Sequence, residues 1–199
     1  MEKIVNLFPV PIMLVDMSDV NCKEKLIEII DSSEKIEHGL VPNGVSSFET
    51  MPILHHPELE ELKIKIEQHI NKYAKCLGIG QLVVQNNWFN IMDEGSKVKR
   101  HNHEASVISG AYYPRAPEGS SKLHFINPLK PFRMTEIHTH QTPYSCFDQD
   151  VECLEDLMIL FPSWLEHYTN ENTTQKRTVV SFNTKSKFAD QNFEYKLDK

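Results

Sequence analysis

Two histidines separated by one residue, His101 and His103, are the first residues whose types and spacing indicate chemistry. In an extended chain, the side chains of residues i and i+2 point to the same face. Both imidazoles could therefore reach one metal ion, since neutral imidazole is a common metal ligand. The pair alone is not specific, because two solvated histidines at the end of a strand would show the same spacing.

Two further residues, far along the chain, could complete such a site. His167 follows the apolar segment 157–161, and Arg177 comes ten residues after His167 at the start of a second apolar segment, 177–183. On a strand, alternate residues of that second segment share one face: Arg177, Val179, Ser181 and Asn183. An inward guanidinium needs an anionic partner, and a planar carboxylate fits it with two parallel hydrogen bonds. That partner is either an Asp or Glu side chain or a bound carboxylate.

The elements that must position these residues change character near residue 80. Before it, the pattern predicts an opening strand over 7–15, helices over 19–30 and 57–78, and a long loop over 36–56. After it, short strands separated by turn residues are predicted over 81–92, 106–113, 122–126, 132–139, 157–161, 177–183 and 193–197. The order indicates an α+β protein whose strands form a sandwich or a jelly-roll barrel. We expect a single domain over 1–199, with helical support in 1–80 and the barrel core in 81–199.

Composition limits the class of protein. The 199 residues are 40% hydrophobic and 25% charged, which is typical of a globular chain, and the net charge of −7 disfavours non-specific nucleic-acid binding. There is no signal-peptide pattern and no apolar run of 18 residues. The four cysteines form no CxxC pair. These features predict a cytoplasmic protein with reduced thiols and neither a membrane nor a nucleic-acid partner.

Taken together, the motifs resemble the 2-oxoglutarate/Fe(II)-dependent dioxygenase superfamily, in particular its prolyl-hydroxylase-like branch and a phage and bacterial family of 2OG-Fe(II) oxygenases within it. The resemblance covers roughly residues 81–184. The matching stretches, in family order, are Asn87-Trp88-Phe89-Asn90, His101-x-His103, Ser109-Gly110-Ala111-Tyr112-Tyr113, Leu123-His124-Phe125-Ile126-Asn127-Pro128, Phe161-Pro162-Ser163-Trp164-Leu165-Glu166-His167 and Arg177-Thr178-Val179-Val180-Ser181-Phe182-Asn183. It implies a double-stranded β-helix of the jelly-roll and cupin-like type.

The resemblance also implies the ligands of an Fe(II) ion. His101 and His167 take the two histidine positions, and His103 stands where most of the superfamily has Asp or Glu. The usual ligand set is two histidines and one carboxylate. Glu104 could supply a carboxylate only through a bulge, because it points away from His103 on a regular strand. We therefore favour His103.

A second group of residues is implied to hold 2-oxoglutarate. Arg177 takes the position that clamps the distal carboxylate, and the hydroxyl of Tyr113 supports that carboxylate. Asn90 faces the cosubstrate from the preceding strand, and Ser181 could add a hydrogen bond.

The implied function is a hydroxylase that consumes O2 and 2-oxoglutarate and releases succinate and CO2, with no catalytic protein group beyond the metal ligands. Its substrate would be a peptidyl residue or a small molecule, and a homodimer is left open. One alternative is a three-histidine, cupin-type metal dioxygenase or metal-binding protein that does not use 2-oxoglutarate. Another is a non-catalytic barrel whose site has decayed.

Three smaller predictions concern the surroundings of the site. The second His-x-His, His138 and His140, is predicted to belong to a strand leading into a lid rather than to bind iron. Residues 135–155 are too long for a tight turn and are predicted to cover the substrate. Trp88 and Trp164 are predicted to belong to the core.

Overall fold

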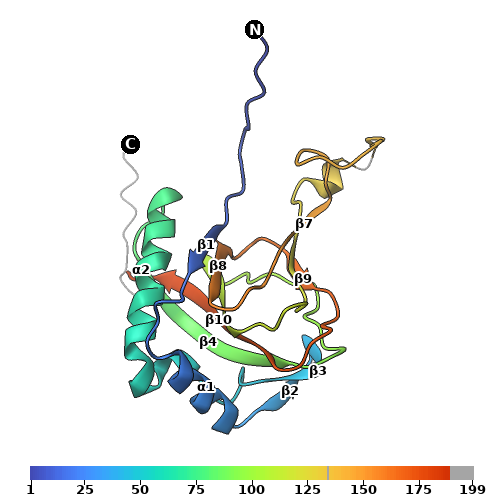
Figure 1. The fold of residues 1–199 in the computed structure, drawn as a ribbon. Coiled ribbons are helices and arrows are strands. Elements are labelled where there is room, and N and C mark those ends of the chain that lie inside the picture. Colours follow the sequence, from blue (N-terminus) through green and yellow to red (C-terminus); the bar gives the residue numbers. More distant parts are fainter. Residues whose placement is uncertain (134, 189–199) are drawn as a thin grey trace.

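A seven-stranded antiparallel sheet dominates the structure, a computed structural model that describes residues 1–133 and 135–188 (Figure 1). In the order in which they pair, its strands are β1 (Met13–Asp16), β8 (Leu157–Pro162), β5 (Ile108–Arg115), β10 (Arg177–Ser186), β4 (Leu82–Met92), β3 (Val41–Ser46) and β2 (Ile36–His38). The long strands β4 and β10 form its centre.

A smaller antiparallel sheet faces the first one. Its order is β7 (Asp148–Val151), β6 (Leu123–Ile126) and β9 (His167–Thr169). Phe125 of β6 packs edge-on against Phe161 of β8, with ring centroids 5.1 Å apart. This contact belongs to an apolar cluster between the sheets that also contains Tyr113, Ile159 and Val179. The two sheets therefore enclose a core of their own, as a jelly roll requires.

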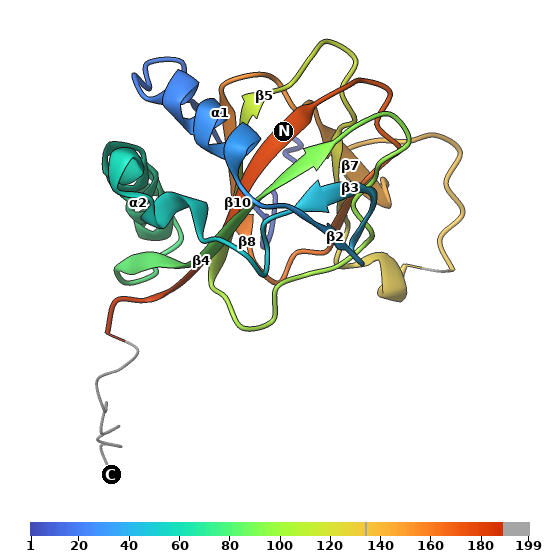
Figure 2. The ribbon, with the colours of Figure 1, turned by 90° about the horizontal axis from the view of Figure 1, so that it is seen from below.

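Two helices cover the outer face of the large sheet, α1 (Lys23–Ser32) and α2 (Glu60–Cys76) (Figure 2). In α2, Leu62, Ile66 and Ile70 recur at helical spacing and are fully buried, as the sequence predicts. They join a cluster with Phe89 of β4 and Phe182 of β10. Short 3-10 helices stand at Ile53–His55 (η1), Pro57–Leu59 (η2) and Lys130–Phe132 (η3). No helix in the described ranges is both long and apolar enough to cross a bilayer.

The predicted loop over 36–56 is wrong, because it contains β2 and β3. The loop signals Pro42, Asn43 and Gly44 lie within β3, where Asn43 takes a positive φ of 61° and Gly44 pairs with Met92 of β4. A Cβ at Gly44 would lie 3.0 Å from the main-chain oxygen of Ile91, so the close strand pairing itself favours glycine.

Three other predicted strands need comment. The opening strand is shorter than residues 7–15, since only Met13–Asp16 pairs. The strand over 132–139 is wrong for its described residues: Phe132 and Ile137 are 83% and 94% exposed, so the segment has no apolar surface to pack against. The strand over 193–197 lies outside the described residues.

Candidate active site

His101 and His167, 66 residues apart in the chain, are joined by a reciprocal pair of main-chain hydrogen bonds. The His101 amide donates to the His167 carbonyl at 3.0 Å, and the His167 amide donates to the His101 carbonyl at 2.9 Å. Two residues further, the His103 amide donates to the carbonyl of Ser163, just beyond β8. The step from His101 to His103 therefore runs from β9, at the edge of the small sheet, to the C-terminal end of β8 in the large sheet.

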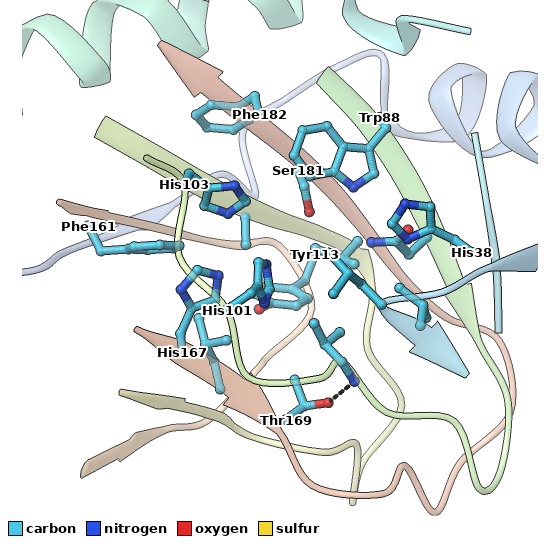
Figure 3. A pocket seen from close by; sticks show the side chains of 18 of the residues that line it. His38, Trp88, His101, His103, Tyr113, Phe161, His167, Thr169, Ser181 and Phe182 are labelled. Carbon is cyan, nitrogen blue, oxygen red and sulfur yellow. Dashed lines mark hydrogen bonds between the residues drawn. The ribbon is translucent and has the colours of Figure 1, made fainter. Parts of the chain in front are cut away.

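This arrangement brings the three imidazoles together (Figure 3). The ring centroids are 4.3 Å apart for His101 and His167, 4.9 Å for His101 and His103, and 5.2 Å for His103 and His167. One ring nitrogen from each lies within 4.8 Å of the others. Two nitrogens on one first-row ion are at most about 4.2 Å apart, because each metal–imidazole bond is about 2.0–2.1 Å long, so binding one ion would draw the three rings closer together.

Two of the rings are held in a defined tautomer. Nδ1 of His101 lies 2.7 Å from the Lys99 carbonyl oxygen, and Nδ1 of His167 lies 2.9 Å from that of Leu165. Because a carbonyl only accepts, Nδ1 carries the proton in both rings and Nε2 keeps its lone pair for a metal. A hydrogen bond of this kind is the usual partner of a metal-binding histidine.

The rings are also uncharged at neutral pH. Burial lowers the pKa of His167 to about 3 and that of His103 to about 4, and it lowers the pKa of His101 as well. A protonated imidazole cannot bind a metal, so burial prepares all three rings for coordination.

No carboxylate belongs to this cluster in the described part of the chain. Glu104 is exposed. The second His-x-His lies elsewhere: His138 contacts Glu136 at 3.2 Å, and His140 is exposed. The structure thus assembles the three histidines expected from the sequence and leaves Glu104, His138 and His140 outside the group.

A cavity of about 160 Å³ extends inward from the histidines between the two sheets, and Arg177 lines it. The Arg177 side chain is 1% exposed and has no carboxylate within ion-pairing distance among the described residues. Nη1 donates to Met92 Sδ at 2.9 Å and Nη2 to Cys153 Sγ at 3.3 Å, while Nε has no hydrogen-bond partner. Sulfur is a weak acceptor, so the charge is poorly compensated and the cavity is suited to an anion.

Other expected residues line the same cavity. Tyr113 lies under the guanidinium, and burial raises the pKa of its phenol well above the usual value, so the hydroxyl keeps its proton. The Asn90 side-chain oxygen is buried without a hydrogen-bond partner. Ser181 and Val179 follow Arg177 at alternate positions of β10 and line the cavity with it, as the strand periodicity predicts. The structure therefore gathers Arg177, Tyr113, Asn90 and Ser181 around one space.

His101 and His103 also border a second, more open groove of about 500 Å³. Its remaining lining is mainly carboxamides with one carboxylate and no basic residue: Gln85, Asn86, Asn102, Glu104, Ala105, Ser106 and Asn183. His101 and His103 thus line both a cavity that contains a buried cation and a more open polar groove.

Several neighbours of the site were not singled out from the sequence. Cys153 and Met92 contact Arg177 through sulfur, a kind of contact that has no sequence pattern. His38 of β2 lines the cavity and comes from the segment predicted as a loop. Trp88 is buried as expected but also lines the cavity, whereas Trp164 is 53% exposed, so its assignment to the core is wrong. Of the described residues in 135–155, none lines the cavity or the groove, although Cys153 contacts Arg177.

The family model described as "Putative 2OG-Fe(II) oxygenase" matches residues 86–183, which span β4 to β10 and contain every residue expected in the site. The chain belongs to the 2OG-Fe(II) oxygenase family. No curated protein matches it.

Several solved structures are similar to this chain in fold. HygX from Streptomyces hygroscopicus, crystallised with nickel, 2-oxoglutarate and hygromycin B, superimposes with a TM-score of 0.65 at 11% identity, covering 90% of this chain and 84% of that one. A Pseudomonas putida prolyl-4-hydroxylase gives 0.61 at 9% identity, covering 87% and 92%. The viral collagen prolyl hydroxylase of Paramecium Bursaria Chlorella virus-1 gives 0.57 at 14% identity, covering 88% and 96%. The predicted α+β double-stranded β-helix is thereby confirmed for this 2OG-Fe(II) oxygenase.

Proposed function

We propose that this 2OG-Fe(II) oxygenase binds Fe(II) and 2-oxoglutarate and hydroxylates a polar substrate, with release of succinate and CO2. The observation that carries the proposal is Arg177, a buried guanidinium without a carboxylate partner among the described residues, which lines the same cavity as three neutral imidazoles.

Nε2 of His101 and Nε2 of His167, together with His103, would hold the iron. Three neutral ligands leave the charge of the site one unit more positive than two histidines and a carboxylate would. A dianionic cosubstrate compensates a doubly charged ion in such a site. When bound, the iron and 2-oxoglutarate supply the oxidising chemistry, and the protein supplies their orientation and a dry cavity.

Four side chains would hold 2-oxoglutarate. Arg177 offers Nε and both Nη atoms to the distal carboxylate in the planar fork that carboxylates fit. The protonated Tyr113 hydroxyl, the Ser181 hydroxyl and Nδ2 of Asn90 can each donate to this dianion, which offers only acceptor oxygens. Each of these groups lines the cavity.

The substrate would approach through the open groove. Carboxamides both donate and accept, which suits amide or hydroxyl groups, and the absence of lysine and arginine from its described lining disfavours an anionic substrate. The groove thus favours a peptide or an uncharged to cationic polar small molecule. No protein general base is required for this chemistry, and we assign none.

Anaerobic titration tests the proposal. Fe(II) is added to metal-free protein and 2-oxoglutarate follows. We expect a visible metal-to-ligand charge-transfer band that appears only with both, and slow substrate-independent succinate release once air is admitted. Iron binding without the band, and without 2-oxoglutarate binding by calorimetry, would favour a cupin-type three-histidine dioxygenase. Failure to bind iron at all would indicate a non-catalytic module.

A further inference from the structure

The third histidine differs from the other two in the partner of its Nδ1 atom. His101 and His167 each face a main-chain carbonyl, but Nδ1 of His103 lies 3.4 Å from the Asn183 carboxamide nitrogen. Asn183 lies on β10, on the inward face that also carries Arg177, and it is 7% exposed.

This partner decides which ring nitrogen of His103 can bind a metal. If the carboxamide presents its NH2 group, Nδ1 must accept, and the ring proton of a neutral imidazole then lies on Nε2. A protonated Nε2 has no lone pair for an ion. Coordination through Nε2 requires the proton on Nδ1 and an acceptor opposite it.

The Asn183 carboxamide can provide that acceptor without moving the backbone. A half-turn about its Cβ–Cγ bond exchanges oxygen and nitrogen in nearly the same positions. Oδ1 then faces the His103 ring, and Nδ2 faces Ser109 Oγ, which lies 2.7 Å from the other end of the carboxamide.

A chain of buried hydroxyls accommodates both orientations. Ser109 Oγ lies 2.8 Å from Ser163 Oγ and either can donate, Ser163 Oγ donates to Ser106 Oγ at 2.9 Å, and Ser106 Oγ donates to the Thr184 carbonyl at 3.0 Å. After the half-turn, every donor points away from His103 and the series ends on a main-chain acceptor. No buried hydrogen-bonding group is left unpaired by the change.

We propose that Asn183 is the positioning residue of the third iron ligand: its carboxamide oxygen accepts the Nδ1 proton of His103, which makes Nε2 the coordinating atom. The inference rests on the proposed iron site and adds to it the residue that sets its least constrained ligand. Asn183 takes for His103 the place that the carbonyls of Lys99 and Leu165 take for the other two rings.

Two substitutions at position 183 distinguish a side chain that accepts a hydrogen bond from one that only fills the space. Asn183→Asp can only accept, so we expect it to bind Co(II), added to metal-free protein, at least as tightly as wild type. Asn183→Leu has no acceptor, and we expect its Co(II) affinity to fall by about 10–100-fold, the usual effect of losing such a partner. Asn86, which pairs with Asn183 across β4 and β10 and lines the same groove, provides the control: Asn86→Asp adds the same charge and should leave the His103 tautomer unchanged.

The direct readout is the ring tautomer, observed by long-range 1H–15N NMR of zinc-loaded protein. We expect His103 to carry its proton on Nδ1 in wild type and in Asn183→Asp. A proton on Nε2 in zinc-loaded wild type, or wild-type Co(II) affinity in a folded Asn183→Leu variant, would overturn the role of Asn183 while leaving the iron site intact. Failure of wild type to bind Co(II) or Zn(II) would overturn the iron site itself.

Discussion

The guanidinium of Arg177 lies over the ring of Tyr113, with Cζ 5.0 Å from the ring centroid, and both side chains are almost completely buried. An aromatic face and two sulfur atoms are weak substitutes for a carboxylate. The protein therefore keeps a cation ready for an anion that it does not itself contain.

Arg177→Met should abolish tight 2-oxoglutarate binding. Losing one partner of a buried, hydrogen-bonded charge pair costs about 2 kcal/mol or more, so the Kd by anaerobic calorimetry should rise by at least about thirtyfold. Metal affinity should be retained. Without 2-oxoglutarate, the free energy of unfolding should stay the same or rise, because a poorly paired buried charge is removed.

The matched control for that prediction is Arg115→Met. Arg115, the last residue of β5, forms an ion pair with Asp31 of α1 and does not line the cavity. Its loss should leave 2-oxoglutarate affinity unchanged. Equal weakening in the two variants would contradict the assignment of Arg177.

His167→Ala should lose the metal and, with it, the charge-transfer band and succinate release. The removed ligand is one of three, and the bridge to His101 keeps the remaining backbone in place because it uses main-chain atoms only. The exposed His140 supplies the control, since His140→Ala should bind Co(II) like wild type. Full metal binding by His167→Ala would refute the three-histidine site.

Substitutions at two neighbouring residues can show whether His103 or Glu104 is the third metal ligand. His103→Ala should weaken Co(II) binding strongly, whereas Glu104→Ala should leave it nearly unchanged, because Glu104 is exposed and outside the cluster. Visible absorption of the Co(II) protein would report the change in ligand set. The opposite order of effects would mean that the chain bulges to bring the carboxylate inward.

Metal-free protein should lose stability in mild acid. In the unfolded chain, His103 and His167 titrate near about 6.5, but burial lowers their pKa in the folded state to about 4 and about 3. Below about pH 6.5 the unfolded state therefore binds more protons, and the free energy of unfolding should fall as the pH drops towards about 4. Urea unfolding across this range measures the slope, and a double substitution of both histidines by asparagine should reduce it.

Gly110→Ala should destabilise the barrel, because an added Cβ would collide with the Phe182 ring and lie 2.8 Å from Leu160 Cδ2. Crowding of this kind in a packed core costs about 1–3 kcal/mol, measurable as a lower urea midpoint. A Cβ added at Gly80 would have no neighbouring atom within 4 Å, so Gly80→Ala serves as the comparison. A similar midpoint shift in both variants would show that steric crowding is not the cause.

Periodicity was sufficient to predict the parts of the site that lie on long strands. Alternation along β10 places Arg177, Val179 and Ser181 on the cavity, and helical spacing correctly predicts the buried face of α2. Both patterns are local, so the sequence alone contains them. The approach of His167 to His101 was expected only from the family resemblance, since β9 has three residues and too little length for a pattern.

Other features depend on contacts that no local pattern records. The turn residues of β3 form a strand because β4 offers a pairing edge, whereas the apolar residues around Ile137 remain exposed because no surface meets them. The sulfur neighbours of Arg177 and the bond between Asn183 and His103 also join distant segments. Such contacts can be identified only in the folded structure, where these segments meet.

The step from His101 to His103 crosses from one layer of the barrel to the other, and His167 begins a strand of the small layer. A single ion bound to all three histidines would link the two sheets at this point. Iron supply would then affect the lifetime of the protein as well as its catalytic turnover. Without iron, the chain would unfold locally around the three histidines first, and proteases would digest it sooner.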